Sequence, residues 1–331
     1  MMIRNLMPLI LCSFFVAGAA VVSQAQVHTQ ISDKEMFVAT WLGDVVYVRV
    51  QTPAPANNQG RGSYLLIHGV SDTSETFDSV AARLLASGHQ VARMDLLGHG
   101  RTLTESLRQG HPTPHEISMA SQAQAVAAVV KALNLKNFVL VGHSYGGAVV
   151  TAAAGLAEVS KKLKALHLLA PFVYRADHMS LHANLPYTNW DWAVQGLSFP
   201  APCDLIYETC VVPGLRDFYH RVLVKRWKWN PDKLSDEQKQ KLEVVIDGAV
   251  AATRGMRPFY TAVEIKQIAP EIPTHLTVAK EDQLIPLVVE EALHKVIQTV
   301  SPSGHYQVLE GTHMFHQEHP EQIVQMLEVK D

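Results

Sequence analysis

Three residue types that cooperate in nucleophilic acyl transfer follow predicted strands in this sequence. Ser144 is the centre of the pentapeptide Gly-His-Ser-Tyr-Gly at residues 142–146, which fits the G-x-S-x-G nucleophile elbow. Asp282 and His313 follow two later apolar runs, so the chain order is Ser, Asp, His. In such a set the histidine removes the serine proton, the serine attacks an acyl carbonyl, and the carboxylate orients the imidazole. These residues are therefore candidates for catalysis through a covalent acyl intermediate.

The elbow has the strand-turn-helix context that its chemistry requires. Residues 138–141 are a short apolar run, typical of a strand buried on both faces of a parallel sheet. Residues 148–157 continue as an alanine-rich helix pattern. A serine at such a sharp turn has a strained backbone, and its flanks pass so close to other segments that only glycine fits there. The helix that begins at the turn points free amide groups toward an oxyanion formed beside Ser144.

Strand and helix patterns alternate along the rest of the chain. We expect strands at residues 63–67, 90–94, 165–169, 275–279 and 306–309, and helices at 76–87, 117–133, 286–299 and 320–329. Two opening strands, residues 37–41 and 45–51, are predicted to be antiparallel and joined by a two-residue turn at Gly43 and Asp44. The alternation predicts a parallel α/β sheet with right-handed crossovers. Functional groups of such a sheet gather beyond the carboxyl ends of its strands, where the three candidates fall.

Five segments together resemble the α/β-hydrolase family, in its capped esterase and lipase type. They are residues 68–69, 95–100, 142–147, 282–286 and 313–320. The resemblance implies an α/β-hydrolase fold, with a mostly parallel central sheet flanked by helices and an inserted helical cap. It also implies that the backbone amides of Val70 and Tyr145 form the oxyanion hole. The motifs are specific for the fold and much less so for the substrate.

The catalytic histidine has one alternative, and the sequence departs from the family pattern beside it. The family usually has glycine immediately before this histidine, whereas Thr312 stands there in this chain. We nevertheless prefer His313 to His316, because Glu318 and Pro320 follow His313 at the family's usual offsets.

The catalytic acid has two alternatives. We prefer Asp282, because residues 282–286 reproduce the family's Asp-x-hydrophobic-hydrophobic-Pro turn. Asp177 lies well beyond the end of its strand, at residues 170–171, although some hydrolases of this fold take the acid from that strand. Glu281 is the adjacent rival, but the turn pattern counts from Asp282.

Residues 172–256 have no clear strand pattern, and we interpret them as a helical cap inserted into a core of residues 26–171 and 257–331. Helical patterns occur there at residues 218–228 and 235–252. The segment 220–229 mixes basic residues with tryptophans; its members are Arg221, Lys225, Arg226, Lys228, Trp227 and Trp229. We interpret it as a solvated helix face with both tryptophans packed inward. The alternative is contact with an anionic membrane.

The first residues have the features of an export signal. Arg4 supplies a positive charge, residues 6–22 are apolar, and residues 23–25 offer a small-x-small cleavage site, which predicts a signal peptide at residues 1–25. A retained membrane anchor is the alternative. We expect a periplasmic or secreted protein, in which Cys203 and Cys210 form a disulfide. Two buried free thiols are the alternative to that bond.

Composition limits the partners. The 331 residues are 47% hydrophobic and 18% charged, with a net charge of -3, as in an ordinary globular protein without a field for binding polyanions. We expect no nucleic acid partner, no cofactor, no metal and no membrane contact after signal removal; His313, His316 and His319 lack a convincing further ligand for a metal. The sequence is silent on oligomeric state.

The main functional prediction is a serine hydrolase acting on a small or medium carboxylic ester. A thioesterase, a lactonase or an acyltransferase would use the same triad, so these remain chemical alternatives. An alternative from another class is a non-catalytic ligand-binding protein on the same scaffold.

Overall fold

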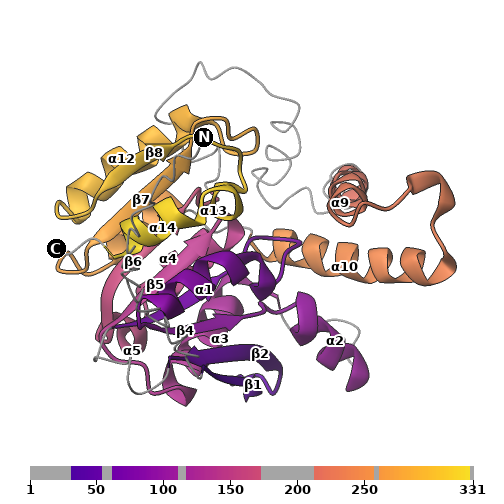
Figure 1. Cartoon of the computed structure of the whole chain (residues 1–331), viewed down its shortest axis with the longest axis horizontal. Coiled ribbons are helices and arrows are strands. Elements are labelled where there is room, and N and C mark those ends of the chain that lie inside the picture. The colour runs from indigo at the N-terminus through magenta and orange to yellow at the C-terminus, as the bar shows by residue number, and fades with distance from the viewer. Residues whose placement is uncertain (1–30, 54–61, 111–116, 173–211, 257–260, 329–331) are drawn as a thin grey trace, which may run out of the picture.

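The computed structural model describes residues 31–53, 62–110, 117–172, 212–256 and 261–328. At its centre is one eight-stranded sheet with the order β1-β2-β4-β3-β5-β6-β7-β8 (Figure 1). The predicted signal peptide, Asp177, and the cysteines Cys203 and Cys210 lie outside the described residues. Export, the disulfide and that rival acid therefore stay predictions.

The sheet is mostly parallel, as the alternation of patterns predicted. Its strands are β1 (Ser32–Ala39), β2 (Val45–Thr52), β3 (Ser63–Ile67), β4 (Gln90–Met94), β5 (Phe138–His143), β6 (Leu163–Leu169), β7 (Thr274–Ala279) and β8 (Tyr306–Leu309). Only the pairings of β2 with β1 and with β4 are antiparallel among these described strands. The carboxyl ends of β3, β5, β7 and β8 therefore meet at one edge of the sheet.

The opening hairpin differs from its prediction in two respects. Ala39 pairs with Val45, so the loop runs over residues 40–44 and is not a two-residue turn. The Thr40 N–H donates to the Asp44 carbonyl at 2.7 Å, and Gly43 adopts a φ of 89° inside this loop. The strand β1 also begins earlier than predicted. The prediction missed its first residues because they are polar, lie exposed on a sheet edge and show no apolar alternation.

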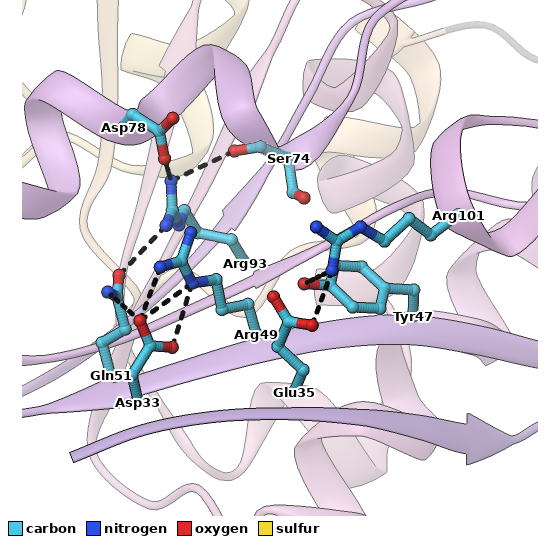
Figure 2. Close-up of polar contacts among 9 residues, drawn as sticks. All are labelled: Asp33, Glu35, Tyr47, Arg49, Gln51, Ser74, Asp78, Arg93 and Arg101. Carbon is cyan, nitrogen blue, oxygen red and sulfur yellow. Dashed lines mark hydrogen bonds and ion pairs between the residues drawn. The ribbon is translucent and has the colours of Figure 1, made fainter.

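Polar side chains fasten this edge strand to the sheet, as Figure 2 shows. Asp33 on β1 accepts hydrogen bonds from Arg49 and Gln51 on β2. The Gln51 side-chain oxygen accepts in turn from Arg93 on β4 at 3.0 Å, and Arg93 pairs with Asp78 on the first helix. Exposed ion pairs such as Arg49–Asp33 contribute little individually, typically below about 1 kcal/mol, but together with the buried Arg93 this network joins three strands and a helix.

Helices cover both faces of the sheet. The longer ones outside the insertion are α1 (Asp78–Ala86), α2 (Gly100–Arg108), α3 (Met119–Ala132), α4 (Tyr145–Ala154), α12 (Leu287–Val300) and α14 (Pro320–Leu327), and the shorter ones are α5 (Ala157–Ser160), α11 (Thr261–Glu264) and α13 (Phe315–Glu318). Leu65 and Ile67 point into the apolar cluster under α3, α4 and α12, whereas Tyr64 and Leu66 point into the cluster under α1 and α14. No described helix is long and apolar enough to cross a membrane.

Within the described residues, the inserted helical region between β6 and β7 contains two long helices. They are α9 (Val212–Arg226) and α10 (Asp236–Gly255), and they project to one side of the sheet in Figure 1. Two glycines let the backbone of α10 touch the core. A Cβ added at Gly248 would lie 2.0 Å from the Gly98 carbonyl oxygen, and one at Gly255 would lie 1.8 Å from the Ile117 carbonyl oxygen. The insertion thus docks through close backbone contact.

We expect Gly248→Ala to loosen this docking. Its added methyl group would meet backbone that cannot give way, and such overpacking costs about 1–3 kcal/mol. Chemical denaturation should register the loss. Gly155→Ala is the matched control, since Gly155 has a φ of -70° and its added Cβ would lie 3.4 Å from the nearest atom. Equal stability of the two variants would contradict close docking at Gly248.

Candidate active site

Ser144 occupies the turn between β5 and α4, with φ 52° and ψ -120°. A non-glycine residue with positive φ is strained. Hydrogen bonds hold it on both sides: its N–H donates to the Leu169 carbonyl at 2.9 Å, and its carbonyl accepts from the N–H groups of Gly147 and Phe172, each at 2.8 Å. The conformation predicted for a nucleophile elbow is thus present at Ser144.

Both glycines of the elbow are required by close contacts. A Cβ at Gly142 would lie 2.3 Å from the Gly146 carbonyl oxygen, and a Cβ at Gly146 would lie 2.4 Å from the His68 carbonyl oxygen. The start of α4 therefore passes directly against the end of β3. This packing brings the turn after β3 beside Ser144.

The structure brings His313 and Asp282 together. The His313 Nδ1 atom lies 2.6 Å from Asp282 Oδ2. Asp282 Oδ1 accepts from the N–H groups of Leu284 and Ile285, so the carboxylate is fixed by its own turn. Glu281, the rival acid in the sequence, is exposed. Because a carboxylate only accepts hydrogen bonds, Nδ1 carries the proton of neutral His313 and Nε2 is free to act as a base.

Glu318 stabilises the loop before His313, where Thr312 departs from the family pattern. The Thr312 N–H donates to Glu318 Oε2 at 2.9 Å, and its hydroxyl donates to Oε1 at 2.5 Å. Gly311 has a φ of 117° and stands one residue before the position at which the family usually has glycine. A threonine is thus accommodated because its side chain bonds to Glu318.

Two buried histidines support His313, and no spacing in the sequence marks them for this role. His143 Nε2 donates to the His313 carbonyl at 2.8 Å, and its ring centroid lies 4.2 Å from that of His316. His316 Nε2 lies 2.9 Å from the Thr76 hydroxyl. Burial lowers the pKa of His316 to about 4, and burial together with His316 and His313 holds the pKa of His143 well below 6.5. Both rings are therefore neutral near pH 7.

A buried carboxyl group also interacts with Asp282. Glu290 on α12 is buried, and burial raises the pKa of its carboxyl group well above 4.5, with a further contribution from the charge of Asp282. Burial therefore favours the protonated form of Glu290. Asp282 supplies the negative charge that faces His313.

A cavity of about 480 Å³ contains Ser144 and His313. One face of α9 supplies much of its wall through apolar side chains at helical spacing, namely Leu215, Phe218, Tyr219 and Val222. Phe172, Met256 and Ile285 extend the apolar lining. The arrangement suits a ligand with an apolar portion next to a reactive group.

The two predicted oxyanion donors also line this cavity. Tyr145 is the first residue of α4, where a backbone N–H has no partner within the helix. Val70 lies in the turn after β3, and a Cβ added at its neighbour Gly69 would lie only 3.2 Å from Ser144 Cβ. Val70, Tyr145 and Ser144 are thus close neighbours across the cavity.

No group of three or more His, Cys, Asp or Glu residues within the described part of the chain has an arrangement that could hold a metal ion. His316 is buried against Thr76 and His143.

The sequence profile of the alpha/beta hydrolase family matches residues 64–326, so the chain belongs to that family. It is similar to the carbendazim-hydrolysing esterase of Nocardioides sp. (strain SG-4G), with 28% identity over 111 residues. That match covers 34% of this chain and 42% of the esterase, so it spans less than half of the relative.

Solved structures with the same fold include esterases. The thermophilic esterase from Thermogutta terrifontis superposes with a TM-score of 0.58 at 18% identity, covering 89% of this chain and 96% of that one. The esterase RhEst1 from Rhodococcus sp. ECU1013 gives a TM-score of 0.59 at 18% identity, covering 88% and 96%. These similarities establish the α/β-hydrolase fold with its inserted helical region.

We expect the stability of the protein to decline in acid through its buried histidines. The pKa of His316 is lower in the folded state than in the unfolded chain, so the unfolded chain binds the proton first as the pH falls. Stability is therefore full above about pH 6.5 and declines toward pH 4, by up to about 1.4 kcal/mol per pH unit for each such histidine.

Urea unfolding at pH 8, 6 and 5 measures this slope. His316→Gln removes one titrating group. It should lower the slope of the unfolding free energy against pH by the contribution of up to one proton, whatever its effect on stability at pH 8. Identical slopes for the variant and the parent protein would contradict the role of His316.

Proposed function

We propose that this protein is a serine hydrolase that cleaves small or medium carboxylic esters through an acyl-enzyme, with Ser144, His313 and Asp282 as its triad. The observation that carries the proposal is the 2.6 Å contact between His313 Nδ1 and Asp282 Oδ2, in a cavity that Ser144 also lines. The esterase names of several relatives support the same class.

In the proposed mechanism His313 Nε2 removes the Ser144 hydroxyl proton as Oγ attacks the ester carbonyl. The resulting oxyanion accepts hydrogen bonds from the N–H groups of Tyr145 and Val70. His313 then donates its proton to the leaving alcohol. A water molecule, deprotonated by His313, hydrolyses the acyl-enzyme and restores the free serine.

The apolar wall from α9 favours an ester with an apolar acyl or alcohol group. Binding such a group removes apolar surface from water, which is worth about 0.8 kcal/mol per buried CH₂. Thioesters and lactones present the same carbonyl chemistry and remain substrates of the same site. The proposal includes a cap at residues 172–256, to which α9 and α10 belong.

The first test uses Ser144→Ala. We expect the parent protein to hydrolyse chromogenic short-chain esters and to be labelled by a fluorophosphonate, and the variant to do neither while keeping its fold. Labelling that persists in the variant would mean that another residue is the nucleophile. A parent protein that binds esters without turnover would instead be a ligand-binding protein on this scaffold.

The second test concerns the acid. Asp282→Asn should lower kcat by about 10⁴, because the uncharged amide no longer stabilises the imidazolium and its NH₂ group, facing His313, would donate to Nδ1 and select the wrong tautomer. Glu281→Gln is the matched control, and since Glu281 is exposed its effect should stay below about tenfold. Steady-state kinetics on one chromogenic ester compares them. The assignment fails if Asp282→Asn remains active while Glu281→Gln or Asp177→Asn is crippled.

A further inference from the structure

Arg226, the last residue of α9, reaches from the inserted helical region to the turn after β3. Its Nη1 atom donates to the Ser71 carbonyl at 2.8 Å and lies 3.1 Å from Asp72 Oδ1. The sequence pattern placed Arg226 on a solvated helix face. In the structure its side chain is only 31% exposed and bridges two parts of the fold.

The turn that Arg226 contacts is strained. The Asp72 N–H donates to the Gly69 carbonyl at 3.3 Å, which closes a four-residue turn, and Ser71 has a φ of 57° at its third position. Positive φ at that position is the mark of a type II turn, where glycine is usual and serine costs on the order of 1 kcal/mol. If Ser71 relaxed to negative φ, the adjoining peptide planes would rotate. The turn therefore needs an external contact to keep one conformation.

Arg226 supplies such a contact at two acceptors. A guanidinium group forms charge-assisted hydrogen bonds in a rigid fork, so it fixes the Ser71 carbonyl and the Asp72 carboxylate relative to each other. Asp72 also accepts from the Thr73 N–H at 2.9 Å, which anchors the far side of the turn. The turn is thus held between its own hydrogen bonds and Arg226.

We propose that Arg226 is a positioning residue that holds residues 69–72 in the conformation that presents the Val70 N–H to the reacting carbonyl oxygen. The inference rests on the proposed function, because it concerns the oxyanion of that reaction. Arg226 acts through the turn and needs no contact with the substrate. Its loss should therefore weaken transition-state binding more than substrate binding.

A competing role would be that of a wall. Arg226, Ser71 and Asp72 line both the cavity of Ser144 and a second cavity of about 710 Å³ between α2 and α10. A residue that merely separates these cavities would change how substrate binds. Such a change raises KM and leaves kcat near its original value. The two roles therefore differ in the kinetic parameter that moves.

The experiment compares three variants on one chromogenic ester. Arg226→Gln should lower kcat by about 10- to 100-fold, less than the roughly 10²- to 10³-fold loss of a whole oxyanion donor, with KM within about threefold. Arg226→Lys keeps the charge without the fork and should fall between. Arg216→Gln is the matched control, because Arg216 on the same helix pairs with Glu243 and Asp247 on α10 and does not line the cavity. It should stay within about threefold of the parent.

The rate of fluorophosphonate labelling separates this inference from the proposed function. Labelling of the parent protein with slower labelling of Arg226→Gln supports the inference. Equal labelling rates and equal kcat, or a raised KM with unchanged kcat, overturn it and leave the proposed function intact. A parent protein inert to both reagents overturns the proposed function itself. Circular dichroism checks the fold of each variant. If Arg226→Gln does not fold, the comparison uses Arg226→Lys instead. A kcat of folded Arg226→Lys equal to that of Arg216→Gln then overturns the inference.

Discussion

The strained, positive-φ backbone conformation of Ser144 is the constraint on which the surrounding structure depends. Such a conformation costs about 1–3 kcal/mol for a residue with a Cβ and persists only where neighbours over-determine it. Here the Leu169 carbonyl and the Phe172 N–H bind Ser144 from the adjoining strand and from the start of the insertion. Gly146 meets the end of β3 at a distance that no Cβ tolerates. The position of Ser144 is thus fixed by backbone packing, and the turn after β3 is brought to it by the same contact.

The strands and turns that follow from local sequence patterns were predictable. The strand that ends at His143 is a continuous apolar run because helices cover both its faces, and the strand before Asp282 is buried for the same reason. The elbow was predictable because its two glycines stand at positions where close packing leaves no room for a Cβ. Asp282 could be distinguished from Glu281 because the turn pattern begins at Asp282. In the structure the backbone N–H groups of that turn bind the Asp282 carboxylate, and the same carboxylate contacts His313.

Features that depend on contacts distant in sequence were not predictable. The beginning of β1 is polar because it lies on an edge held by ion pairs, so it lacks the alternation of a half-buried strand. The roles of His143 and His316 come from contacts with His313 and Thr76, which no spacing encodes. Arg226 stands in a run of basic residues, which in the sequence is typical of a solvated helix face. Only the approach of α9 to Ser71 gives it a different environment from Lys225.

The neutrality of the groups around His313 has a consequence for the proposed chemistry. Burial keeps His143 and His316 uncharged near pH 7, and it favours the protonated form of Glu290. A fixed positive charge beside His313 would disfavour the imidazolium that must form when Ser144 is deprotonated. An ionised Glu290 would instead repel Asp282 and compete with it for that imidazolium. The charge of Asp282 lies in direct contact with His313, and the 2.6 Å contact directs it to the Nδ1 side of the ring. The basic nitrogen is then Nε2, the one that the proposed mechanism requires for Ser144.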